Sequence, residues 1–346
     1  MLALATKAAQ EPRADIPACS RLWRAASANS DALAFSSCKR LVQLSVLMPI
    51  AALEWVREDT YIPSDTTRYF RTAMTSRPGF TSSPSGVPGF DPRTPSIARV
   101  YDYLLGGKDN FAADRAVAHK LLAVYPPIIE TVPEGRRFVE RAVTWVAGQG
   151  ITQFIDLGAG LPTDPNTHAT AQAASPAAAI AYVDNDPVVI SHLTALLAHH
   201  GDRIAVIAGD LHDCNAILSD AGLRAVINLR TPVCVVMGMI LHFDTLEAAA
   251  GLVKRYMSAV APGSYLIATI ASGKGSLAAK FYRTYNARGF AMMYNHSSAD
   301  FASFFGDLEI IPPGLGDARR IRPGWRELMS APRRPDRILA GIARVL

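Results

Sequence analysis

Short apolar runs alternate with amphipathic segments through most of this chain, and the alternation predicts a regular series of strands and helices. Five runs of four to six residues have the apolar character of buried strands, and a helix is predicted between each pair. These predicted strands are Thr152–Leu157, Ile180–Val183, Ile204–Ala208, Val233–Met237 and Tyr265–Ile270. Alternation alone predicts an open α/β sheet.

Three helices are predicted before the first of these strands. The first, Ser96–Leu105, carries its apolar residues on one side and ends at Gly106-Gly107. The next two are Phe111–Val124 and Arg136–Ala147. The end of the chain adds a helix near Ser298–Phe305, a strand near Leu308–Ile311 and a final strand near Arg337–Val345.

The first ninety residues differ from the rest because they show no clear periodicity. Their strongest apolar run, Leu41–Val56, is shorter than the ~20 residues that a membrane span needs, and polar residues and a proline interrupt it. It also lies too far from Met1 to be an ordinary signal peptide. We therefore expect no membrane association.

A change of composition marks the boundary of the predicted folded domain. Residues 75–95 are rich in proline, glycine and serine and predict a disordered linker. We expect residues 1–90 to form a poorly ordered extension, and 91–346 to form the folded domain. Met74 stands just before the linker, which suggests the hypothesis that translation starts there and that the preceding residues are an over-extended reading frame. Peptides from that region in native cells would contradict the hypothesis.

Composition and charge narrow the class of protein. Hydrophobic residues make up 49% of the 346 residues, which is ample for a core. The net charge of +5 is mildly basic, but no dense Lys/Arg run with interleaved aromatics is present, so we expect no nucleic-acid partner. The four cysteines form no CxxC pair and are typical of reduced thiols in a cytoplasmic protein. Histidines show no metal-ligand spacing with Cys or Asp, so we predict no metal.

The first and second predicted strands end in residues that suit a nucleoside. Asp156-Leu157-Gly158-Ala159-Gly160 makes a glycine turn after the first strand, where bare backbone lets a ligand approach. Asp184 ends the second strand, at the distance where a carboxylate accepts hydrogen bonds from a ribose diol. Asn185 is a candidate to flank the base, whereas Asp186 before Pro187 fits a helix cap. Gly158 and Gly160 could also be plain turn residues.

Two details argue against a dinucleotide in this turn. Pro162-Thr163 stands where the dinucleotide fingerprint has its third glycine. A carboxylate at Asp156 also suits a cationic or neutral ligand better than a phosphate, although it could be a plain strand-end acid. S-adenosylmethionine, which carries a sulfonium, an ammonium group and no phosphate, is a ligand of this kind.

Three passages together resemble the class I S-adenosylmethionine-dependent methyltransferases, and more narrowly the actinobacterial family of the DUF574 type. They are Pro95–Phe111 (PSIARVYDYLLGGKDNF), Phe154–Thr163 (FIDLGAGLPT) and Tyr182–Pro187 (YVDNDP). The likeness covers about residues 91 to 346. It departs from the family pattern at Gly135-Arg136, where an Asn-Arg pair is expected before Phe138.

The resemblance implies a fold and a set of contacts. The fold is a Rossmann-like, seven-stranded, mostly parallel sheet with helices on both faces and an N-terminal helical cap over residues 95–148. Asp210, after the third strand, would meet the adenine amine, with the Leu211 amide nearby. The family signature would fold over the cofactor edge and bring Tyr101 and Asn110 to the cofactor.

The expected function is methyl transfer from S-adenosylmethionine to a small-molecule acceptor. His242, at the end of the fourth strand, is the candidate general base, and a structural or pocket-lining role is its alternative. The segment Ser272–His296 is a candidate acceptor wall, or ordinary core. Two other functions stay open at this point: a non-catalytic nucleoside-binding protein and an NAD(P)-dependent oxidoreductase.

Overall fold

The structure is a computed structural model that describes residues 91–197, 202–287, 291–330 and 337–346. The predicted extension over 1–90, its apolar run and the Met74 start lie outside the described residues. In the described part of the chain, no helix combines the length and the apolar character that crossing a membrane requires.

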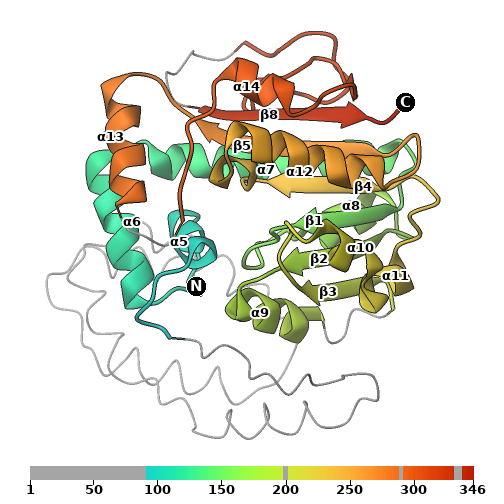
Figure 1. The fold of residues 1–346 in the computed structure, drawn as a ribbon, viewed down its shortest axis with the longest axis horizontal. Coiled ribbons are helices and arrows are strands. Elements are labelled where there is room, and N and C mark those ends of the chain that lie inside the picture. The colour runs from blue at the N-terminus through green and yellow to red at the C-terminus, as the bar shows by residue number, and fades with distance from the viewer. Residues whose placement is uncertain (1–90, 198–201, 288–290, 331–336) are drawn as a thin grey trace, which may run out of the picture. The chain divides into compact units, whose positions relative to one another are not determined.

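A single mixed sheet organises the described residues (Figure 1). Its strands are β1 (Gln153–Leu157), β2 (Ala179–Asp184), β3 (Ile204–Ala208), β4 (Cys234–Gly238), β5 (Tyr265–Ser272), β6 (Glu309–Ile310), β7 (Gly316–Asp317) and β8 (Arg337–Arg344). The order is β3-β2-β1-β4-β5-β8-β6, with β7 paired to β8. The first five strands are parallel, and β8 runs antiparallel to β5, β6 and β7.

The predicted α/β fold is confirmed, with one strand more than the seven expected. The extra strand, β7, pairs only Gly316 and Asp317 with Ala340 and Leu339. A two-residue strand has no apolar period of its own, so the sequence pattern gives no sign of it.

Helices cover both faces of the sheet (Figure 1). They are α5 (Ile97–Leu104), α6 (Ala112–Val124), α7 (Ile128–Gly148), α8 (Thr167–Ala174), α9 (Pro187–Leu197), α10 (Cys214–Ser219), α11 (Ala221–Val226), the 3-10 turn η4 (Leu241–Phe243), α12 (Leu246–Ser258), α13 (Gly275–Asn286) and α14 (Ser298–Ser303). One core packs α10, α11, α12 and α14 on the sheet. The other packs α7, α8 and α9 on the opposite face.

A third apolar cluster forms the helical cap. It contains residues of α5, α6 and α13 and of the first turns of α7. These segments lie together at one side of the sheet (Figure 1). The predicted start of α7 at Arg136 is wrong, because the helix begins at Ile128 and continues through Pro133. Its added turns bury Ile128 and Val132 in the cap, while later residues such as Phe138 pack on the sheet. One helix therefore connects the cap to the sheet.

Candidate cofactor-binding site

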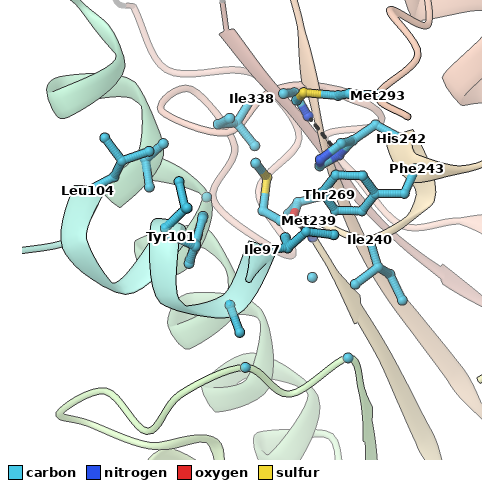
Figure 2. A pocket seen from close by; sticks show the side chains of 18 of the residues that line it. Ile97, Tyr101, Leu104, Met239, Ile240, His242, Phe243, Thr269, Met293 and Ile338 are labelled. Carbon is cyan, nitrogen blue, oxygen red and sulfur yellow. Dashed lines mark hydrogen bonds between the residues drawn. The ribbon is translucent and has the colours of Figure 1, made fainter. Parts of the chain in front are cut away.

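One cavity of about 540 Å³ opens at the carboxyl ends of the parallel strands. This volume lies within the range of about 300–1,000 Å³ that is typical of ligand sites. On one side, α5 contributes Ile97, Tyr101 and Leu104, which face Met239 and Ile240 after β4 (Figure 2). Crevices beyond the carboxyl ends of such strands are where open α/β sheets bind ligands.

The glycine turn after β1 forms part of the cavity wall. Gly158 and Gly160 both have positive φ, of 64° and 67°. A Cβ on Gly158 would come within 2.5 Å of Ile240 Cγ2, whereas one on Gly160 would meet open space. Gly158 is therefore needed to close the turn against β4, and Gly160 leaves bare backbone facing the cavity.

Replacing Gly158 with alanine is expected to be more damaging than replacing Gly160. Both changes place a Cβ in the left-handed region, which costs about 1–2 kcal/mol, but only Gly158→Ala adds a steric clash. We expect a lower melting temperature for Gly158→Ala than for Gly160→Ala, measured by thermal denaturation. Equal melting temperatures would show that Ile240 moves aside freely.

Asp184 ends β2 with its carboxylate at the cavity. Its Oδ2 accepts a hydrogen bond from Gly160 N at 2.9 Å, and its Oδ1 accepts one from Asp186 N at 2.9 Å. The side chain is buried, and burial raises the pKa of Asp184 despite these two backbone donors. The neighbouring Asn185 also lines the cavity. Asp184 thus couples the glycine turn of β1 to the end of β2.

Asp156 lies deeper, on β1. Its Oδ2 accepts a hydrogen bond from Thr167 Oγ1 at 2.6 Å, and the residue is 5% exposed. Burial raises the pKa of Asp156 to about 6, opposed by the Thr167 hydrogen bond and by the charge of Arg136. A buried carboxylate of this kind gains from a cationic ligand, because the ligand charge would offset its desolvation.

Arg136 lines the cavity from α7 and was not among the residues predicted from the sequence. Its Nη2 donates to Pro165 O at 2.9 Å, while its buried Nε makes no hydrogen bond within the described part of the chain and lies 3.9 Å from Glu140 Oε1. The sequence departs from the family pattern next to this residue, at Gly135, but the sequence alone does not predict that the Arg136 guanidinium reaches the cavity.

A histidine joins two carboxylates at the cavity rim. Asp210, after β3, accepts hydrogen bonds from His212 N at 2.9 Å and shares a contact of 2.8 Å with His212 Nδ1. His212 Nε2 lies 2.9 Å from Asp244 Oδ1, after η4. Between them, Leu211 O accepts a hydrogen bond from Tyr256 Oη. The sequence predicted Asp210 and Leu211 but missed His212 and Asp244, which are 32 residues apart.

The contacts of His212 with Asp210 and Asp244 predict that part of the folding stability depends on pH. Burial disfavours the imidazolium, but the hydrogen bonds and charges of Asp210 and Asp244 outweigh it and raise the pKa of His212. A raised pKa in the folded state stabilises the fold below the unfolded value of about 6.5, and the contribution disappears as pH rises through the folded value. We expect His212→Gln to lower the melting temperature more at about pH 6 than at about pH 8.5. A difference that grows with pH would contradict the link.

The signature segment forms two buried polar networks. In the first, Asp114 is fully buried and accepts hydrogen bonds from Arg99 Nε at 2.9 Å, Ser96 N at 2.9 Å and Phe111 N at 2.8 Å. Ser96 Oγ in turn donates to Asp186, whose other oxygen caps α9 by accepting from Val188 N. The network therefore fastens α5 to the end of β2.

The second network concerns Asn110, one of the predicted cofactor residues. Asn110 does not line the cavity; its Nδ2 donates to Asp102 Oδ2 at 2.8 Å and to Gly107 O at 3.0 Å. A Cβ on Gly107 would clash with the Asp102 carboxylate, so the glycine leaves room for that side chain. Asn110 shapes the loop between α5 and α6, whereas Tyr101 does reach the cavity (Figure 2).

Comparison with known proteins now assigns the family. Residues 86–346 match the model of the S-adenosyl methyltransferase family. The chain belongs to this family. A protein of Thermobifida fusca YX, provisionally classed as a methyltransferase, is 36% identical over 76% of this chain and 99% of its own, with a TM-score of 0.68. A DUF574 family protein of Streptomyces avermitilis MA-4680 is 31% identical over 74% of this chain and 99% of its own, with a TM-score of 0.67. No curated protein matches the chain.

The cavity therefore belongs to an S-adenosylmethionine-dependent methyltransferase, as the sequence predicted. The predicted cofactor residues that line it are Asp156, Gly158, Gly160, Asp184, Asn185, Asp210, Leu211 and Tyr101. Membership of a methyltransferase family argues against the alternative that the protein is an NAD(P)-dependent oxidoreductase. In the part of the methyltransferase that the structure describes, no group of three or more His, Cys, Asp or Glu side chains could hold a metal ion.

His242 lines the cavity of the methyltransferase but is poorly suited to take a proton. It is 2% exposed, and burial, with a smaller effect of His296, lowers its pKa to about 3. Its Nδ1 accepts a long hydrogen bond of 3.4 Å from Ala271 N, which places the ring proton on Nε2 (Figure 2). The ring packs 4.4 Å from that of Phe243. The geometry favours the pocket-lining alternative.

Proposed function

We propose that this methyltransferase transfers the methyl group of S-adenosylmethionine to a small-molecule acceptor by in-line displacement. One observation carries the proposal: a single cavity extends from the carboxyl ends of the parallel strands to an apolar chamber under the helical cap. A methyl acceptor must reach the sulfonium from the side opposite the breaking bond, and a continuous cavity provides such a path.

The residues present fit this cofactor. We assign the ribose hydroxyls to Asp184 and the adenine amine to Asp210, with Leu211 and Asn185 beside the base. Asp156 would balance the ammonium group, since a second positive charge beside that of Arg136 would further offset the burial of its carboxylate. Arg136 would receive the cofactor carboxylate, and the exposed backbone of Gly160 lets this end of the cofactor lie close.

The chemistry asks little of the protein beyond orientation. The bound cofactor supplies a methyl group that its own positive charge activates. The chain holds the acceptor in line, which can contribute several kcal/mol, up to about 7–11 in the best cases. With the pKa of His242 near 3, this ring is too weak a base to help. An acceptor that brings a lone pair of its own needs no base at His242.

A crystal structure with S-adenosylhomocysteine tests the proposal. We expect the ribose at Asp184 and open space beside the sulfur that leads toward Phe281 and Tyr285. A sulfur sealed by side chains would favour the non-catalytic alternative. In parallel, release of S-adenosylhomocysteine should be stimulated by the low-molecular-mass fraction of a cell extract. Stimulation by the macromolecular fraction alone would contradict a small-molecule acceptor.

A further inference from the structure

We propose that the apolar chamber selects an uncharged, flat ring compound as the methyl acceptor. This inference rests on the proposed function, because it names the substrate class of the same cavity. We define the acceptor chamber by six lining residues, Leu104, Leu121, Tyr125, Ile128, Phe281 and Tyr285, which come from α5, α6, α7 and α13.

The shape of the chamber is set by a series of aromatic rings. Tyr125 and Phe281 meet edge to face with centroids 5.6 Å apart, and Phe281 lies 6.3 Å from Tyr285. The ring of Tyr285 lies 6.2 Å from that of Phe243, which follows His242 in the 3-10 turn η4 after β4. The rings thus extend from the cap to the edge of the sheet. Aromatic walls favour flat ligands because rings pair in stacked and edge-to-face arrangements.

None of the six residues that define the chamber has a side chain that is charged at neutral pH. Burial raises the pKa of Tyr285 above its ordinary value. Tyr101, at the border with the cofactor edge, has its pKa raised to about 12, mainly by burial. Thr131, a polar residue nearby, already donates its hydroxyl to Pro127 O at 2.9 Å within its own helix. A charged acceptor would therefore be buried here without a partner, which is strongly unfavourable.

The charged groups of the cavity lie outside the chamber. Asp156 lies within β1, Asp184 ends β2, Asp186 and Asp210 follow β2 and β3, and Asp244 is bound to His212. The positive charge of Arg136 lowers the pKa of Asp156 against the effect of burial, and Arg337, at the start of β8, donates to Ser298 Oγ at 2.7 Å. The cavity is thus divided: its polar end suits the charged groups of the cofactor, and its apolar end suits a ligand with no net charge.

A charge series on one two-ring frame tests the inference. The probes are 2-naphthamide, 2-naphthoate and 2-naphthamidine, which have nearly the same shape and are neutral, anionic and cationic. Binding is measured by calorimetry, both with and without saturating S-adenosylhomocysteine. We expect the amide to bind at least about tenfold more tightly than either ion. Equal or tighter binding of an ion, or no binding of the amide, would overturn the proposal.

Two variants at Tyr285 test whether the aromatic rings of the chamber account for the binding of the neutral probe. Tyr285→Leu removes a ring, and we expect the affinity for 2-naphthamide to fall about fivefold or more. Tyr285→Phe keeps the ring and should leave that affinity within about twofold, which makes it the matched control. Equal losses in both variants would contradict ring packing. If Tyr285→Leu fails to fold, the charge series on the unaltered protein still decides the question.

The same measurements separate this inference from the proposed function. If S-adenosylhomocysteine does not bind but the neutral probe does, the proposed function fails and the chamber preference stands. If S-adenosylhomocysteine binds but the neutral probe has no advantage over the ions, the acceptor class is wrong and the proposed function stands.

Discussion

Replacing Asp184 with alanine is expected to weaken S-adenosylhomocysteine binding by about 100-fold or more. A carboxylate at the end of β2 can accept a hydrogen bond from each ribose hydroxyl, and hydrogen bonds to charged groups contribute about 1.5–3 kcal/mol each. Losing two of them removes about 3–6 kcal/mol of binding free energy. The measurement is isothermal titration calorimetry at fixed pH.

The fold should tolerate this change better than the site does. Asp184→Ala removes acceptors from Gly160 N and Asp186 N, which lowers stability. However, burial raises the pKa of Asp184, so its charge is costly in the free protein and removing it offsets part of the loss. We expect the free energy of unfolding to change by no more than about 1–2 kcal/mol.

A second aspartate provides the matched control. Asp213 caps α10, where its Oδ1 accepts from Ala216 N at 3.1 Å, and it does not line the cavity. Asp213→Ala should cost about 1 kcal/mol of stability, as loss of a helix cap does, and leave S-adenosylhomocysteine affinity unchanged. Unchanged affinity in Asp184→Ala would instead remove Asp184 from the ribose site.

Local sequence signals predicted most of the sheet and part of the site. The five parallel strands have apolar runs bounded by glycine or acid residues, so the backbone pattern itself marks them. Asp156, Gly158 and Asp184 follow directly from strand ends, because parallel strands all present their carboxyl ends at one edge. What a strand end carries can therefore be predicted before the fold is known.

Residues that reach the site from other elements could not be predicted in this way. His212 meets Asp244 only because the loops after β3 and β4 come together, and Arg136 reaches the cavity from the middle of a helix. The start of α7 was missed because Pro133 is normally read as a helix stop. Asn110, predicted from the family signature as a cofactor contact, does not line the cavity and holds the loop after α5 through Asp102, which a sequence motif alone does not reveal.

Replacing Asp114 with asparagine is expected to lower the free energy of unfolding by about 3–5 kcal/mol. Asp114 is fully buried and lies with its Oδ2 2.9 Å from Nε of Arg99, which is 3% exposed. Removing its charge takes away the carboxylate that is 2.9 Å from Arg99 Nε, whereas Asp186 Oδ2 lies farther away, at 3.9 Å from Arg99 Nη1. The asparagine also offers one acceptor where two backbone N–H groups and Arg99 now donate.

Urea denaturation measures this loss, and two variants control for it. Arg99→Met combined with Asp114→Asn should recover part of the stability, because no buried cation remains. Arg93→Met removes a pair with Asp91 at 3.0 Å that is exposed to solvent, with Arg93 at 89% exposure, and should change stability little. A double variant no more stable than Asp114→Asn would show that the backbone contacts of Asp114, and not the charge, matter most.

The same change should also weaken cofactor binding, although Asp114 does not line the cavity. Asp114 holds the Ser96 backbone, and Ser96 Oγ donates to Asp186 beside Asn185. Loosening this contact lets α5 move away from the cavity that Ile97 and Tyr101 line. Because ordering α5 would then have to accompany binding, S-adenosylhomocysteine affinity should fall about tenfold. A less stable protein with unchanged affinity would mean that the family signature serves the fold alone.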